Sequence, residues 1–450
     1  MKYDVHSRAG FLFFGRKRPG FDPGWGEEVA RQARKLIADT FPGAGVYSET
    51  VTDTKTMLRA LEYLDAQSCT IAVVIQPTMS DGSLVPALAA NWPHEILLWA
   101  TGEKQSGEMI SACSLVGAHT FGATLAQLGH RFEILASHPA DPDCASHMEE
   151  KLTMLGCLDS LKTASFGTGY HAPGFIDMHH DPSLLKKTFG AQARYISTQD
   201  VMQALDTVSA QAAEQDCAAV KAMNIPQNGV DDEDLLQQSA CYLAFTNMMR
   251  DNNLAGLSLR EWPDLPRIAG VWPYIAFARL AEDGEAAACE GDLDGALSCF
   301  VAEKLGFGRT YLSDWLEHDE ETICTWHGGA CPVSLCQAPG EKGGPVFTRH
   351  FNSDIPAVID ASLKEGMPVT ILRMWHNDYR YCITALEGET ITPRRHLKGT
   401  NGLVKVHNAN VSAWFEDKIL DGFPHHITLV EGHHITSLKR FARLAGIRFV

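Results

Sequence analysis

Three clusters of acidic and histidine residues are the strongest candidates for chemistry in this sequence. Glu290 follows an apolar run, Asp314 follows a second apolar run 24 residues later (314 − 290), and the pair His433-His434 lies near the C-terminus. Two carboxylates and an imidazole form a mixed oxygen and nitrogen ligand set that suits Mn²⁺ or a similar divalent ion. A cation would also relieve the repulsion between two neighbouring carboxylates, which otherwise favours protonation of one of them.

The elements expected around the two carboxylates are buried strands joined by a helix. Residues 286–289 have the apolar pattern of a buried strand, residues 294–304 that of a helix, and residues 310–312 that of a second strand. Ligands of open α/β sheets bind at the carboxyl ends of parallel strands. We therefore expect adjacent parallel strands to present Glu290 and Asp314 side by side.

Each cluster also has a purely structural interpretation. Glu290 and Asp292 precede the expected helix and are suited to capping its first turn. A pair of adjacent histidines by itself is more often structural than a ligand. The order in which the three clusters follow one another is therefore more informative than any one of them.

The apolar patterns divide the chain into three predicted domains. Residues 1–160 alternate between helical and strand patterns, with strands expected at 70–75, 96–100 and 132–136. Residues 161–320 continue this alternation, whereas residues 321–450 are rich in strand patterns and include a hairpin signal at Asn377-Asp378. The predicted fold class is α/β, with two doubly wound α/β domains followed by a C-terminal antiparallel β-barrel-like domain.

Composition and charge exclude several classes of protein. The 450 residues carry 38 basic and 55 acidic side chains, a net charge of −17, which argues against general nucleic-acid binding. No run of about 18 uninterrupted apolar residues predicts a membrane span. The N-terminus also lacks the pattern of a signal peptide, so we expect a cytoplasmic protein without membrane partners.

The twelve cysteines are irregularly spaced and mostly lie in apolar contexts. Buried, reduced thiols are expected for such a pattern in a reducing compartment. A zinc site remains an alternative where Cys324, Cys331 and Cys336 cluster around His327. The paired spacing of structural zinc ligands is absent there, which disfavours it.

Short motifs distributed along nearly the whole chain form a characteristic series. In chain order they are the turn Arg18-Pro19-Gly20-Phe21-Asp22, then IAVVIQPTMSDG, ILLWATGE, REWP, CEGDLDGALS, TWHGGACP and EGHHITSLKRFARLAGIRFV. This series resembles the L-fucose/L-arabinose isomerase superfamily, especially its shorter, fucose isomerase-like members. The specific part of the resemblance is the order and spacing of the EGD segment, the second aspartate and the histidine pair.

The resemblance implies a metal-dependent aldose–ketose isomerase that interconverts a sugar aldose and its ketose through a cis-enediolate. It implies Mn²⁺ as the cofactor, with Mg²⁺ or Co²⁺ as alternatives. Glu290 and Asp314 fall on the paired carboxylate ligands that also act as acid and base, and His434 falls on the histidine ligand. It further implies a homo-oligomer, a trimer or hexamer, whose subunits share active sites.

The resemblance also implies a set of sugar-binding side chains, with Arg18 reaching the site of a neighbouring subunit. The residues in this set are Arg18, Glu261, His327 and His433. The chain departs from the superfamily here, because Glu261 replaces a cysteine or glutamine and HGGA replaces HCGN. His327 is the nearest candidate for the additional histidine ligand of L-arabinose isomerases. These departures concern the identity of the sugar, and a 6-deoxy or 6-sulfo hexose is among the substrates expected.

Two other functions remain open from the sequence. A non-catalytic sugar-binding protein, or another metal-dependent enzyme such as an epimerase, would be compatible with the same fold. A nucleotide-dependent oxidoreductase is disfavoured because no G-x-G-x-x-G follows a strand near the N-terminus.

Overall fold

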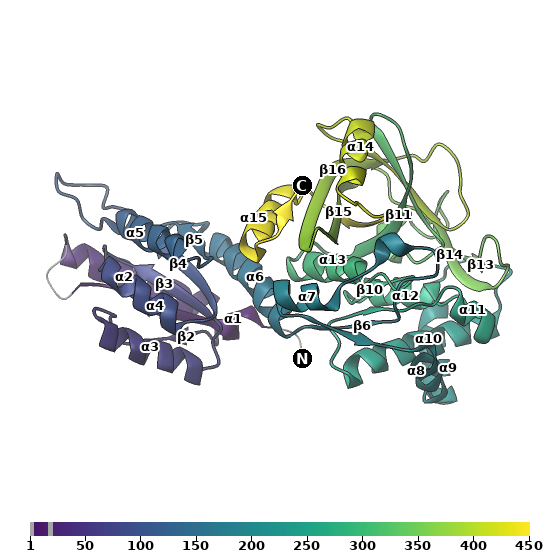
Figure 1. Ribbon diagram of the computed structural model, residues 1–450, viewed down its shortest axis with the longest axis horizontal. Helices are drawn as coiled ribbons and strands as arrows, with labels where there is room; N and C mark the ends of the chain where they lie inside the picture. Colours follow the sequence, from purple (N-terminus) through teal and green to yellow (C-terminus); the bar gives the residue numbers. More distant parts are fainter. Residues whose placement is uncertain (1–3, 17–20) are drawn as a thin grey trace. The chain divides into compact units, whose positions relative to one another are not determined.

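The computed structural model describes residues 4–16 and 21–450. The chain divides into two compact units, Met1–Ser160 and Leu161–Val450. Figure 1 shows the helices and strands of each unit. Arg18, which the resemblance assigns to the sugar-binding set, lies outside the described residues.

The first unit contains a parallel sheet with the strand order β2-β1-β3-β4-β5. Its strands are β1 (Ala9–Phe13), β2 (Gly45–Val46), β3 (Ile71–Gln76), β4 (Glu95–Ala100) and β5 (Glu133–Ala136). Its helices are α1 (Val5–Arg8), α2 (Pro23–Thr40), α3 (Thr54–Ala66), α4 (Val85–Asn91), α5 (Ser114–Gln127) and α6 (Cys144–Thr163), the last of which continues into the second unit. This is the order of a doubly wound sheet, as the sequence predicts.

Helices cover both faces of this first sheet. Leu12 and Val74 pack in one cluster with residues of α3, α4 and α5. Arg34 of α2 lies 3.9 Å from the centre of the Phe13 ring, on the opposite face. Successive side chains of a strand point to opposite faces, so both faces of β1 are buried, which explains its continuous apolar pattern.

The second unit begins with a parallel sheet in the order β10-β9-β6-β7. Its strands are β6 (Ser165–Thr168), β7 (Gln192–Tyr195), β9 (Gly256–Ser258) and β10 (Ala286–Ala288). Its helices are α7 (Pro182–Phe189), α8 (Thr198–Asp206), α9 (Ala210–Ala222), α10 (Asp232–Asp251), α11 (Asp264–Ile268), α12 (Tyr274–Glu282) and α13 (Leu293–Lys304).

Six antiparallel strands then close into a barrel. They are β11 (Thr310–His318), β12 (Thr322–His327), β15 (Pro368–Asn377), β16 (Arg380–Ile391), β17 (Thr400–Val406) and β18 (His426–Glu431). Their order is β16-β15-β18-β11-β12-β17, and pairing of β17 with β16 closes the ring. The elements outside the ring are β8 (Gln227–Asn228), β13 (Val346–Arg349), β14 (Pro356–Ser362), α14 (Val411–Leu420), α15 (Ile435–Ala445) and β19 (Arg448–Phe449). The predicted barrel-like C-terminal region is confirmed.

The hairpin predicted at Asn377-Asp378 connects β15 and β16, but its two turn residues lie one position further along the chain, since Asn377 is the last residue of β15. Asn377 pairs with Arg380, and the two residues between them, Asp378 and Tyr379, have φ angles of +52° and +57°. A two-residue turn with both φ angles positive matches the twist of antiparallel strands. Asp is well suited to the first of these positions, which is why the sequence signal was informative.

The structure corrects the predicted position of Asp314. Residues 310–312 were expected to form a short parallel strand, but β11 is a nine-residue antiparallel strand of the barrel, and Asp314 lies within it. The two carboxylates are therefore not presented by adjacent parallel strands. The predicted domain boundary near residue 320 falls between β11 and β12, so the barrel begins before it.

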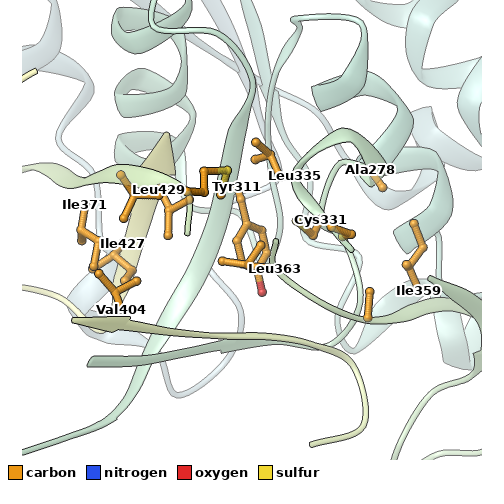
Figure 2. Packing of buried hydrophobic residues seen from close by; sticks show 14 of the residues in the cluster. Ala278, Tyr311, Cys331, Leu335, Ile359, Leu363, Ile371, Val404, Ile427 and Leu429 are labelled. Atoms are coloured by element: carbon orange, nitrogen blue, oxygen red, sulfur yellow. The ribbon is translucent and has the colours of Figure 1, made fainter. Parts of the chain in front are cut away.

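The interior of the barrel is filled by aliphatic side chains from its strands. Ile371, Val404, Ile427 and Leu429 lie close together in Figure 2 and belong to one buried cluster. The same cluster extends to Ala278 of α12 and to residues around β14, so the barrel shares its core with the parallel-sheet layer. This shared core explains why residues 161–450 form one compact unit.

Helix α13 contacts both layers of the second unit. It packs on β9 and β10 of the parallel sheet and on β11, β15 and β18 of the barrel. Figure 1 shows α13 beneath β15 and beside β10. Just before it, the buried Asp292 accepts hydrogen bonds of 2.5 and 2.8 Å from the guanidinium of Arg373 on β15. Both side chains are at most 1% exposed, so this ion pair fixes the start of α13 to the barrel.

Two composition-based expectations can be compared with the structure. All twelve cysteines are free, and all except the half-buried Cys113 are buried. Among the described residues, no helix is long and apolar enough to cross a membrane.

We predict that Arg373→Met destabilises the protein by about 3–5 kcal/mol, because it leaves the Asp292 carboxylate buried without its cation. The free energy of unfolding, measured by guanidinium titration, tests this. Arg395→Met is the matched control, since Arg395 pairs with Glu317 across 3.0 Å with both side chains largely exposed. Equal losses in the two variants would contradict the role given to the buried pair.

Candidate functional site

Glu290 occupies a tight turn between β10 and α13. Its φ angle is +61°, its N–H donates to Glu261 Oε2 at 2.8 Å, and its carbonyl accepts from Ala172 N–H at 2.7 Å. Gly291 follows with φ +73°, and a Cβ there would lie 1.6 Å from the carbonyl oxygen of Tyr170. Only glycine fits that close approach, so the glycine of the EGD motif holds Glu290 in place.

Asp314 and His426 face one another across the antiparallel pair β11 and β18. Residues directly opposite in such a pair share one face of the sheet. Asp314 Oδ1 lies 3.4 Å from His426 Nε2, and Glu290 Oε2 lies 3.9 Å from the same nitrogen. The barrel therefore supplies the aspartate and the histidine, whereas the parallel-sheet layer supplies the glutamate.

The ring of His426 is fully buried and is oriented by Asp292. Its Nδ1 lies 2.9 Å from Asp292 Oδ2. The carboxylate of Asp292 is ionised, because the Arg373 pair outweighs the penalty of burial and lowers its pKa far below the usual value. Nδ1 therefore carries the proton, and Nε2, which has no hydrogen-bond partner within residues 4–16 and 21–450, presents a lone pair to the two carboxylates.

Two groups of side chains have the spacing of metal ligands, and they share His426. One consists of Glu290, His425 and His426, and the other of Asp314, His327 and His426. The ligand atoms of each group lie within 4.8 Å of one another. Metal-binding histidines usually donate a hydrogen bond from the N–H of their other ring nitrogen to a carboxylate or carbonyl, as His426 does to Asp292.

Burial perturbs the acids and bases of this site. It raises the pKa of Glu290 to about 9, with added repulsion from Glu261 and Asp314. It raises the pKa of Glu261 to about 8, although the Glu290 N–H opposes this. Burial also lowers the pKa of His327 to about 4, so its ring is neutral and able to act as a ligand. The site therefore gathers acidic groups whose charge is unfavourable unless a cation joins them.

His425 connects the site to the β6–α7 loop, residues 169–181. Its Nδ1 lies 2.5 Å from Asp177 Oδ2, and its backbone N–H donates to the same oxygen at 3.1 Å. Burial opposes the charge of Asp177, but these hydrogen bonds outweigh it and lower its pKa to about 2. Asp177 thereby holds the loop beside the start of β18.

The structure does not bring His434 to this site. His434 Nε2 lies 2.7 Å from the carbonyl oxygen of Glu431, and its ring stacks on Phe307 at 3.8 Å. His433 Nε2 lies 3.2 Å from the carbonyl oxygen of Gly388. Both histidines follow the C-terminal end of β18, whereas His426 begins this strand. The strand is six residues long with a rise of about 3.3 Å per residue, so the two histidine pairs lie at opposite ends of it.

The sequence analysis therefore selected the wrong histidine pair for the cluster with Glu290 and Asp314. The tetrapeptide HHIT occurs at 425–428 and again at 433–436, so residue type did not distinguish the two copies. The first copy begins strand β18, and only the pairing of that strand with β11 distinguishes it from the second copy. Of the expected sugar-binding residues, Glu261 and His327 lie at the site, and His433 lies apart from it.

The cysteine-rich segment around His327 is the alternative zinc site that the sequence left open. None of the three cysteines belongs to a group with metal-ligand spacing among the residues that the structure describes. His327 instead faces Asp314 and His426. Tyr274 and His350 extend this side of the site, since the Tyr274 ring lies 5.5 Å from His327 and 6.2 Å from His350.

Comparison with known proteins points to isomerases. No protein-family model matches the chain. The sulfoquinovose isomerase of Alkalicoccus urumqiensis is 26% identical over 396 residues, which cover 86% of this chain and 87% of the relative. The sulfoquinovose isomerases of Priestia aryabhattai and Clostridium sp. (strain MSTE9) are 24% and 26% identical, over 82% of this chain and 82% and 83% of the relatives. These relatives support an isomerase enzyme, as the sequence predicts.

A second ion pair lies at the start of α13, close to the site. Asp294 is 2% exposed; its Oδ2 lies 3.1 Å from His376 Nδ1, and its Oδ1 accepts from the Tyr381 hydroxyl at 3.0 Å. The hydrogen bond that His376 donates to Asp294 raises the pKa of His376 above its usual value, against the effect of burial.

This raised pKa predicts a pH-dependent contribution to stability. A histidine whose pKa is raised by folding stabilises the protein below its unfolded pKa of about 6.5, and the stabilisation is lost as pH rises through the folded value. His376→Gln should therefore lower the free energy of unfolding more at pH 6 than at pH 9. Denaturant titrations at the two pH values test this, and Asp294→Asn should also reduce the dependence on pH. An equal loss at both pH values would contradict it.

Proposed function

We propose that this chain is a metal-dependent aldose–ketose isomerase of the fucose isomerase-like kind, acting on a sulfonated hexose. The observation that carries the proposal is the convergence of Glu290 and Asp314 on the unpaired Nε2 of the buried His426. The names of the relatives support the isomerase reaction and a sulfo sugar as substrate. A sugar-binding protein without catalysis would not require two acids beside an oriented imidazole.

The residues of the site fit a divalent cation. Glu290 and Asp314 offer carboxylate oxygens, and His426 offers a lone pair whose direction Asp292 fixes. His425 and His327 complete the two groups with ligand spacing. Oxygen and imidazole donors without thiolate suit Mn²⁺, with Mg²⁺ or Co²⁺ as alternatives.

The reaction requires removal of a weakly acidic proton from C2 of the aldose. A bound ion would supply positive charge beside O1 and O2 of the sugar, which makes that proton easier to remove. One carboxylate then takes the C2 proton and returns it to C1, while the other moves a proton between O1 and O2. Each transfer of this kind is worth roughly 10²–10⁴-fold.

The surroundings of the two carboxylates differ, which suits different roles. Burial and neighbouring acids raise the pKa of Glu290 to about 9, as expected of a carboxylate with a high affinity for a proton. The side chain of Asp314 is 24% exposed, against 16% for Glu290. We therefore assign the C2 proton to Glu290 and the transfer between oxygens to Asp314.

Three expectations from the sequence analysis stay predictions. They are a homo-oligomer with shared sites, a role of Arg18 in the site of a neighbouring subunit, and a cytoplasmic location. Sedimentation of the metal-loaded protein would test the first, since a fully active monomer would exclude shared sites.

The role of Glu290 predicts the behaviour of Glu290→Gln. This change keeps the size of the side chain and removes its charge and basicity, so the turnover number should fall by at least about 10²-fold. The measurement is uptake of deuterium from D₂O by aldoses, including deoxy and sulfo sugars, followed by NMR with Mn²⁺ present. The exposed Glu389 provides the control Glu389→Gln, which should behave as wild type. Tight sugar binding without exchange or ketose in the wild type would instead favour the sugar-binding protein.

The two histidine pairs predict opposite results for matched variants. His426→Gln should weaken Mn²⁺ binding at least about tenfold and abolish activity, because the buried lone pair is lost. His434→Gln should leave both nearly unchanged, since its ring contacts Glu431 and Phe307 instead. Calorimetric titration of Mn²⁺ into the metal-free variants distinguishes them. Loss of binding in His434→Gln alone would restore the assignment made from the sequence.

A further inference from the structure

Four histidines form a second cluster beside the candidate metal site. His171, His179 and His180 belong to the β6–α7 loop, and His376 lies on β15. The ring of His179 is central, with centroids 6.4 Å from His171, 6.3 Å from His180 and 5.9 Å from His376. None of the functions argued above uses these imidazoles.

His180 is a buried member of the cluster whose ring nitrogens are unsatisfied. It is 2% exposed, and neither of its ring nitrogens has a hydrogen-bond partner among the residues that the structure describes. Its ring stacks on Tyr170 at 5.3 Å, and burial lowers its pKa, which keeps the ring neutral. A buried imidazole with both nitrogens unsatisfied is unfavourable unless a ligand or water binds to it.

The cluster is accessible from solvent on one side. His179 is exposed, Tyr170 is 49% exposed, and His171 is half-buried. The acids around it are already engaged: Asp177 with His425, Asp181 with the first backbone N–H groups of α7, and Asp294 with His376 and Tyr381. The cluster therefore offers imidazole nitrogens to a ligand; each neutral ring supplies one N–H donor, and Nδ1 of His171 already lies 3.0 Å from the carbonyl oxygen of Ala172.

The β6–α7 loop places this cluster next to the proposed chemistry. Ala172, adjacent to His171, donates its N–H to the carbonyl of Glu290. Asp177, two residues before His179, holds His425 beside Asp314. The same loop therefore contacts the carboxylate cluster at two points and carries three of the four histidines.

The spacing of the imidazoles suits a larger ligand than a metal ion. Among the residues that the structure describes, these four histidines do not form a group whose ligand atoms all lie within 4.8 Å. A sulfonate is a permanent anion with three acceptor oxygens, and N–H donors spaced around it can each bind a different oxygen. The raised pKa of His376 adds a positively charged donor.

We propose that His171, His179, His180 and His376 bind the sulfonate of the sugar and thereby make the enzyme selective for a sulfonated hexose. This inference rests on the proposed isomerase function and identifies the part of the site that recognises the anionic end of its substrate. His179, the exposed central ring, is the side chain expected to contribute most to selectivity.

The test compares two sugars that differ only in the sulfonate: sulfoquinovose and 6-deoxyglucose. In His179→Leu, kcat/KM for sulfoquinovose should fall about 10- to 100-fold, as expected for loss of a hydrogen bond to a charged group. The value for 6-deoxyglucose should stay within about twofold of wild type. Inorganic sulfate should compete with sulfoquinovose in the wild type and much less in the variant. His407→Gln is the control, because His407 is an exposed histidine after β17.

Several outcomes would overturn the inference. They are an equal loss for both sugars, no loss for either, or loss of a second equivalent of bound Mn²⁺ or Zn²⁺ in His179→Leu. A wild-type enzyme that isomerises only unsulfonated sugars would refute the inference and the sulfonated substrate, and would leave the isomerase reaction standing. If the wild type turns over no sugar, the proposed function fails, and calorimetric binding of sulfoquinovose to wild type and His179→Leu still decides the inference.

Discussion

The ion pair between Asp292 and Arg373 is the interaction on which the site depends. Neither charge is exposed, so each requires the other, and the pair joins the turn before α13 to strand β15 of the barrel. Asp292 also accepts a hydrogen bond from Nδ1–H of His426, and this bond directs the free Nε2 toward Glu290 and Asp314. A contact that connects two layers of the fold therefore also determines which imidazole nitrogen faces the two acids.

The parallel-sheet layer and the barrel each position different residues of the site. The parallel-sheet layer presents Glu290 through a turn with positive φ angles that only a following glycine permits. The barrel presents Asp314 and His426 through strand register, which places them opposite one another. Burial, together with the acidic groups gathered between the layers, raises the pKa of Glu290, and a cation is the simplest way to balance these acids. The loop that carries Asp177 and three further histidines contacts the same site through His425 and through the carbonyl of Glu290.

Much of the fold was predictable because local patterns in the sequence carry it. Continuous apolar runs indicated parallel strands buried on both faces, and Asn377-Asp378 indicated the hairpin between β15 and β16. Glu290 was correctly placed after a strand and before a helix. Asp314 was expected at the end of a parallel strand but lies within the antiparallel strand β11. A short apolar run does not reveal whether the neighbouring strands are parallel or antiparallel.

By itself the sequence determined the types of side chain in the site, the turn that holds Glu290 and the resemblance to sugar isomerases. It did not determine which histidine completes the cluster, because HHIT occurs twice within twelve residues (425 to 436). Only tertiary structure distinguishes the copies. Strand β18 runs from His426 to Glu431, its pairing with β11 sets His426 opposite Asp314, and the rise of the strand carries His434 beyond its far end. The hydrophobic pattern of a strand fixes which face is buried, but which distant strand it pairs with is decided only when the barrel assembles.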